Sequence, residues 1–187
     1  MQMHKKTSGY LLIFLGLLMF CGSAILHMVN ERQDRLAGEN AALLLDNLEQ
    51  EIHFNLGKNQ SVLLYNMAGR LRIPSLGLEL PVMNEWNYDL LQISPCRYSG
   101  DAKSGDLIIM GHDYDSHFGK LKKLKEGQEI YFEPKGASVP ISYTVAGIET
   151  LHKTEIEKLP DSDYPLSLFT CTASGQYRLV VRCDLKE

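Results

Sequence analysis

The N-terminal part of the chain contains a long run without formal charge. No Asp, Glu, Lys or Arg occurs between Thr7 and Asn30, and residues 10–29 are almost entirely apolar. About 20 such residues span the hydrocarbon core of a bilayer as a single helix. The run therefore predicts a transmembrane anchor at residues 10–29, and a folded domain has to be built from the residues that follow it.

The charges on the two sides of this run predict its orientation. His4, Lys5 and Lys6 precede it, and positive residues beside a membrane helix tend to stay in the cytoplasm, whereas the flank at 31–35 carries both signs. We therefore expect a single-pass protein of the cell membrane, with a cytoplasmic N-terminus at residues 1–9 and an extracellular C-terminal domain. A cleaved signal peptide is the alternative, because Ser23-Ala24-Ile25 loosely resembles a cleavage site, although the apolar run is long for such a peptide.

A second helical pattern follows the anchor. From about Arg32 onward, acidic residues separate four apolar residues that recur at helical spacing, namely Ala41, Leu45, Leu48 and Ile52. The pattern runs to about Leu56, and the polar segment 57–60 ends it. We therefore expect residues 30–60 to form an extracellular spacer helix and linker without a chemical role, and residues 61–187 to form the folded domain.

From Val62 onward the pattern changes to a β-type pattern. Short apolar stretches, several of them alternating with polar residues, are separated by turn residues. Many short strands separated by turns are typical of a β-sandwich or a closed barrel. We expect strands at 71–73, 78–82, 107–110, 129–132, 140–148, 166–170 and 176–184, one or two helical turns at 86–93, and a helix at 115–126.

The balance of charges argues against one class of partner. The formal net charge of the chain is -4, and residues of both signs are interspersed. Proteins that bind nucleic acids usually present a basic face. We therefore expect no nucleic-acid partner.

The four cysteines have different settings. Cys21 lies in the apolar run, where it is expected to act as a small apolar residue. Cys96, Cys171 and Cys183 remain, which is an odd number for an extracellular domain. Two alternatives stay open for Cys96 and Cys183: buried structural thiols, which we favour, or a disulfide that leaves Cys171 free.

Cys171 and Arg178 flank a turn-rich stretch between the last two predicted strands. A hairpin centred on Ser174-Gly175 sets Cys171 opposite Arg178, because positions equidistant from the turn face each other across an antiparallel pair. A cation beside a cysteine favours the thiolate, which is the nucleophilic form of the side chain. The pattern therefore predicts a cysteine nucleophile at Cys171, with a core cysteine as the alternative.

His112 is the candidate base that this nucleophile requires. The apolar run at 107–110 is predicted to be a buried strand, and Gly111 and His112 follow it directly. A residue just past a strand is held by a rigid element and stays accessible to a substrate. A metal site is the alternative, although no regular element converges its four side chains, His112, Asp113, Asp115 and His117.

These motifs resemble those of the sortases, which are cysteine transpeptidases of Gram-positive cell surfaces. The resemblance rests on Thr170-Cys171 at a strand end, on Tyr-Arg-Leu-Val-Val-Arg at 177–182, and on Gly111-His112 upstream. It extends from about Met67 to Asp184 through the apolar patterns at 70–82 and 118–130. Each motif alone is common, but all of them in this order behind a membrane anchor are specific.

The resemblance implies both a fold and a set of roles. The expected fold is mainly β, an eight-stranded barrel with short helices. Cys171 is then the nucleophile, His112 is the acid and base, and Arg178 stabilises the oxyanion, with no cofactor or metal. Arg182 lies on the same face of its strand as Arg178 and is expected to be solvated or ion-paired.

The resemblance also implies the substrate. Such an enzyme cleaves an LPXTG-like sorting signal at the C-terminus of a secreted surface protein through a thioacyl-enzyme. It then transfers that protein to an amine acceptor, such as a peptidoglycan precursor or a pilin lysine. The segment at 149–165, which we expect to be a loop, corresponds to the signal-recognition region of the family. The compact segment after His112 fits class B least, and the sequence does not distinguish the other classes.

Three alternatives remain open. Cysteine, histidine and arginine chemistry equally allows hydrolysis by an extracellular cysteine hydrolase. An L,D-transpeptidase also places a histidine before a cysteine, but it would require a Ser-His-Gly-Cys-like motif, which Phe169-Thr170-Cys171 lacks. A membrane-anchored adaptor would use the barrel as a docking surface without catalysis.

Overall fold

The computed structural model describes residues 3–49 and 66–186, and the chain divides into two compact units, Met1–Arg35 and Leu36–Glu187. Helix α1, Met3–Glu49, forms the first unit and continues into the second. Among the described residues, α1 contains the single stretch that is long and apolar enough to cross a membrane, and the side chains of that stretch are exposed. By length and composition this stretch agrees with the predicted anchor.

The predicted spacer helix is continuous with the anchor helix. No proline interrupts residues 10–49, so the helical hydrogen bonds continue from one segment into the other. In the second unit Ala37, Ala41 and Leu44 are buried, whereas Leu45 is half-buried. The predicted apolar stripe is therefore confirmed at Ala41 and wrong at Leu45, because the preceding residue, Leu44, is the buried one. The expected stripe residue Ile52, the side chain of Leu48 and the expected helix end near Leu56 lie outside what the structure describes.

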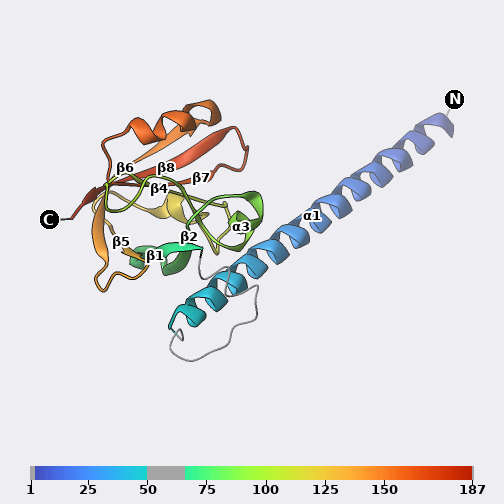
Figure 1. Cartoon of the computed structure of the whole chain (residues 1–187). Coiled ribbons are helices and arrows are strands. Elements are labelled where there is room, and N and C mark those ends of the chain that lie inside the picture. Colours follow the sequence, from blue (N-terminus) through green and yellow to red (C-terminus); the bar gives the residue numbers. More distant parts are fainter. Residues whose placement is uncertain (1–2, 50–65, 187) are drawn as a thin grey trace. The chain divides into compact units, whose positions relative to one another are not determined.

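The rest of the second unit is a closed barrel of eight strands, as predicted (Figure 1). Around the barrel the order is β1-β2-β3-β4-β7-β8-β6-β5. Neighbouring strands are antiparallel except for the pairs β2/β3 and β4/β7, which are parallel. The strands are β1 Met67–Ile73, β2 Leu78–Met83, β3 Cys96–Ser99, β4 Leu107–Gly111, β5 Glu129–Pro134, β6 Ile141–His152, β7 Leu166–Cys171 and β8 Tyr177–Leu185.

Short helical elements lie between these strands. Helix α3, Tyr88–Ile93, follows β2, as the sequence predicts, and its first turn is capped by the side chain of Asn87. Three 3-10 elements complete the described part of the unit: η1 Pro74–Leu76, η2 Leu121–Lys123 and η3 Lys153–Asp161.

Alternation along the strands decides which side chains fill the barrel. In β7, Leu166 and Leu168 belong to the large interior cluster, whereas Phe169 belongs to a second cluster on the outer face. Element η3 covers this outer cluster with Ile156 and Leu159. The outer faces of β4, β7 and β8 are therefore packed beneath η3. Cys171 ends β7, Arg178 lies at the start of β8, and His112 directly follows β4.

Three segments differ from the sequence-based expectation. The expected strands did not include β3, Cys96–Ser99. The helix expected at 115–126 is reduced to η2, because the N–H groups of His117 and Gly119 both donate to the Tyr114 carbonyl and close a tight turn. The apolar face predicted there is nevertheless buried, at Phe118, Leu121 and Leu124. The segment expected as a loop at 149–165 begins as the last part of β6 and continues as η3.

Candidate active site

The β7–β8 hairpin brings Cys171 and Arg178 together. Cys171 is the last residue of β7, and its partner across the antiparallel pair is Arg178. The turn is closed by hydrogen bonds from Thr172 N–H to the Tyr177 carbonyl (3.1 Å) and from Gly175 N–H to the Thr172 carbonyl (2.8 Å). Gly175 has a φ of 69°, a conformation that glycine adopts without strain. The predicted pairing is therefore confirmed.

Strand alternation places both side chains on the outer face of the sheet. Cys171 lies two residues after Phe169, and Arg178 lies two residues before Val180, and both apolar residues belong to the outer cluster. The Cys171 side chain is exposed, so a substrate can reach its sulfur. The pair thus presents a thiol and a guanidinium to the same side of the barrel.

The turn also orients the guanidinium of Arg178. Its Nη1 atom donates to the carbonyls of Gly175 and Tyr177, at 3.0 Å each. These bonds to fixed backbone groups restrict the motion of a long side chain. The cation on the strand opposite Cys171 is therefore partly preorganised.

Arg182, further along β8, has different surroundings. It is buried, and its Nε atom lies 2.7 Å from a carboxylate oxygen of Glu149 in an ion pair. Its Nη1 atom donates to the hydroxyls of Ser162 and Ser167, at 3.0 Å each. The ion-paired role expected for Arg182 is confirmed, and these contacts link β8 to β6 and β7.

Strand β4 brings His112 to the same end of the sheet. β4 is parallel to β7, and Gly111 pairs with Thr170. His112 and Cys171 are the next residues along the two strands, and neighbouring strands lie about 4.8 Å apart. The register therefore places the backbone of His112 next to that of Cys171, so the three residues that the sequence predicts for the site lie at the same edge of the sheet.

A short loop folds back on His112. The Phe118 N–H donates to the His112 carbonyl at 3.0 Å, and the Tyr114 ring lies 4.7 Å from the imidazole between ring centroids. The imidazole is half-buried as a result, and this loss of hydration lowers the pKa of His112 below its ordinary value of 6.5. The neutral imidazole is therefore the dominant form at neutral pH.

We expect Tyr114→Ala to raise the pKa of His112 toward its ordinary value, because water then replaces the ring that covers the imidazole. A lowered pKa means that the imidazolium accumulates only as the pH falls below 6.5. The variant should therefore hold more imidazolium than the wild type at the same pH. An NMR titration of ¹³C-labelled histidine in the full-length chain measures this midpoint. Tyr88→Ala, which removes an exposed tyrosine ring elsewhere in the chain, is the control, and equal midpoints in both variants would contradict the prediction.

Cys96 and Cys183 are buried free thiols. Burial raises the pKa of each of them to about 12. The favoured alternative of two structural thiols is therefore confirmed, and no disulfide joins them. Cys171 is the exposed cysteine of the barrel, because Cys21 lies in α1.

The residues considered for a metal site differ in burial, so their side chains do not surround one common position. His117 is fully buried, whereas Asp113 and Asp115 are exposed. Within residues 3–49 and 66–186, no group of three or more histidine, cysteine or acidic side chains is placed to hold a metal ion. His117 instead packs beneath Tyr114, with ring centroids 5.7 Å apart.

An open hollow of about 490 Å³ extends from the outer cluster. Tyr98 lines it, and the Tyr98 ring lies 5.2 Å from the ring of Phe169, two residues before Cys171. Trp86 lines it as well, at 6.0 Å from Tyr98 between ring centroids. Aromatic faces of this kind are suited to contact a polypeptide.

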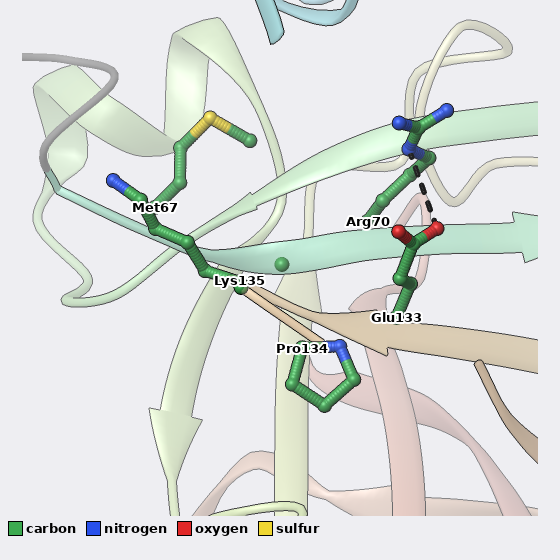
Figure 2. Close-up of a pocket in the computed structure, with 7 residues that line it drawn as sticks. Met67, Arg70, Glu133, Pro134 and Lys135 are labelled. Carbon is green, nitrogen blue, oxygen red and sulfur yellow. Dashed lines mark ion pairs between the residues drawn. The ribbon is translucent and has the colours of Figure 1, made fainter. Parts of the chain in front are cut away.

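Figure 2 shows a second hollow, of about 190 Å³, with a different location. It lies between β1 and β5, where the Arg70 Nε atom is 3.9 Å from a carboxylate oxygen of Glu133. In the barrel order, β1 is separated from β7 by three strands on either side. This hollow is therefore not part of the site around Cys171.

Sequence reasoning missed two groups near the site. Tyr114 stands between two residues considered as metal ligands, and its role as a cover for His112 depends on a turn that no periodicity indicates. Ala37 and Leu44 were missed because the predicted stripe on α1 began at Ala41. Their spacing of four and three residues around Ala41 was the available signal.

Comparison with known proteins agrees with this architecture. A family model described as "Sortase domain" matches residues 71–186. Solved structures with this fold include sortase C-1 from Actinomyces oris (20% identity, TM-score 0.58, covering 73% of this chain and 85% of that one). Listeria monocytogenes sortase A has 22% identity and a TM-score of 0.57, covering 65% and 88%. Sortase C from Clostridium perfringens SM101 has 21% identity and a TM-score of 0.53, covering 88% and 97%. None of the curated proteins matches the chain.

Proposed function

The chain belongs to the sortase family of cysteine transpeptidases, and on that premise we propose that Cys171, His112 and Arg178 form its catalytic centre. One observation carries this assignment. The register of three adjacent strands sets Cys171 opposite Arg178 and sets the end of β4, which leads to His112, beside the end of β7. This register supports the proposal that a nucleophile, a proton carrier and a fixed cation act together at one edge of the barrel.

The proposed acylation step gives each group a role. The Cys171 thiol first passes its proton to the neutral imidazole of His112, and the resulting thiolate attacks the carbonyl carbon of the scissile peptide bond. The carbonyl oxygen becomes an oxyanion that the guanidinium of Arg178 stabilises. The carbon–nitrogen bond then breaks, and the imidazolium of His112 gives its proton to the departing amine. A thioester on Cys171 and a neutral imidazole remain.

The second step reverses these roles. Neutral His112 takes a proton from an incoming amine, which attacks the thioester carbon. The carbon–sulfur bond breaks, the thiolate of Cys171 is restored, and a new amide bond joins the acyl group to the acceptor. No cofactor is used, because both steps only move protons and an acyl group.

We propose that the acyl donor is an LPXTG-like sorting signal at the C-terminus of a secreted surface protein. The acceptor is then an amine of a peptidoglycan precursor or a pilin lysine. The anchor supports this proposal, because it would hold the barrel where exported proteins emerge if the basic residues before it stay in the cytoplasm. The aromatic hollow at Trp86 and Tyr98 is suited to contact the donor peptide.

Mass spectrometry of the full-length chain in detergent micelles tests this proposal. Incubation with an LPXTG peptide should add the mass of the N-terminal peptide fragment to a fragment that contains Cys171. Addition of a glycine or lysine amine should convert this adduct into a ligated peptide. Release of free acid at the same rate with and without amine would instead indicate a hydrolase. Absence of any adduct would favour the adaptor alternative.

A further inference from the structure

We infer that residues 36–46 of α1 are a positioning element for His112, and this inference rests on the proposed function. These residues belong to the same compact unit as the barrel. Ala37 and Ala41 are 2% exposed and Leu44 is 4% exposed, whereas Ala42 and Leu43 are exposed. One face of this helical segment is therefore covered by the barrel.

The covered face reaches the loop that follows His112. A Cβ atom added to Gly38 would lie 3.1 Å from the Cβ of Ser116, so the helix backbone rests directly on that residue. Ala41 belongs to the same buried cluster as Phe118. The helix thus contacts the loop at Ser116 and shares a packed core with its end.

A second buried cluster links the helical segment to β4. Leu44 belongs to a buried cluster with Met83, Leu91 and Cys96. Met110, two residues before His112, packs against this cluster. The same helical segment is therefore packed together with residues on both sides of the histidine.

Displacement of the loop would move His112, because the loop and the histidine are joined. The Phe118 N–H donates to the His112 carbonyl at 3.0 Å. The Phe118 ring leaves no room at Gly111, where an added Cβ would lie 2.6 Å from two of its carbons. Tyr114 lies between the rings of His112 and His117, at 4.7 and 5.7 Å. A shift of the helix against Ser116 would therefore displace the packed side chains of the loop, and the imidazole would move with them.

The helical segment touches no reacting atom, so its residues are positioning residues. Small shifts of a catalytic group caused by remote substitutions can lower the rate by about 100-fold. The β7–β8 hairpin that carries Cys171 and Arg178 is closed by its own turn. Disturbing the helix should therefore affect the histidine and leave the thiol accessible.

The experiment compares Ala41→Leu with Ala42→Leu in the full-length chain. Both variants add the same atoms to adjacent residues of one helix, but only Ala41 faces the core. For Ala41→Leu we expect kcat to fall about 10- to 100-fold with little change in KM. We also expect a shifted titration midpoint of His112 and unchanged methanethiosulfonate labelling of Cys171. Ala42→Leu should match the wild type in all three measurements.

A double-mutant cycle keeps the inference testable if Ala41→Leu unfolds. Gly38→Ala should lower kcat and shift the titration midpoint of His112, because its methyl group presses on Ser116. Ser116→Gly, which removes the opposing Cβ, should restore both values in the double variant. Variants of Gly38 and Ala41 that fold and behave like Ala42→Leu would overturn the inference. Absence of transpeptidation by the wild-type chain would instead overturn the proposed function. In that case the titration of His112 in the Gly38 and Ala41 variants would still test whether the helix positions the histidine.

Discussion

Cys171→Ala in the full-length chain is expected to abolish turnover of a fluorogenic sorting-signal peptide. The substitution removes the sulfur that would carry the acyl group, and loss of a covalent nucleophile costs on the order of 10⁶-fold in kcat in a well-studied hydrolase. The barrel should stay folded, because this side chain is exposed. Fluorescence release at equal concentrations of folded protein measures the loss.

Cys21→Ala is the matched control for this variant. Cys21 is also an exposed cysteine, but it lies in the first unit, outside the barrel. This variant should retain full turnover and full methanethiosulfonate labelling of the barrel, whereas Cys171→Ala should lose both. The buried thiols of Cys96 and Cys183 should not react in the folded chain. Unchanged turnover in Cys171→Ala would end the assignment of the nucleophile.

Arg178→Ala is expected to lower kcat by about 100- to 1000-fold, because removal of one oxyanion donor has an effect of this size. Arg178→Lys should recover part of this loss, since it restores the charge but not the planar guanidinium that bonds to the turn. Steady-state kinetics of both variants with the same peptide measure the two effects. An Arg178→Ala enzyme with wild-type kcat would show that another group stabilises the oxyanion.

Arg182→Met tests the other arginine of β8, which we expect to stabilise the fold and not to take part in catalysis. It removes the ion pair between the buried Arg182 and the exposed carboxylate of Glu149, together with two hydrogen bonds, so we expect the free energy of unfolding to fall by about 2–3 kcal/mol. The methionine keeps the volume of the side chain, and the catalytic edge lies four residues away along β8. Thermal unfolding should therefore shift while kcat of the folded enzyme remains close to that of the wild type.

The local parts of this fold could be predicted from the sequence. The Cys171–Arg178 pairing follows from the position of Ser174-Gly175, because a two-stranded hairpin has a register that its turn determines. The buried face at Phe118, Leu121 and Leu124 was also predicted, although the helix expected around it was not formed. Apolar spacing indicates burial more reliably than it indicates the backbone conformation.

The non-local parts could not be derived in this way. The parallel pairing of β4 with β7 joins segments far apart in the sequence, and no turn specifies its register. The eight-stranded barrel therefore rested on the family resemblance and not on periodicity. The spacing of Ala37 and Leu44 around Ala41 indicated a buried face, but the surface that covers this face exists only in the folded barrel.

The order in which the strands pair has a consequence during biogenesis. The β7–β8 hairpin joins neighbouring segments and can form in microseconds, whereas the β4–β7 pairing closes a much longer loop and forms later. A chain that is still folding would thus hold Cys171 and Arg178 opposite each other before His112 reaches the same edge. Without that imidazole the proposed acylation could not be completed, so we expect activity to appear only after the barrel has closed.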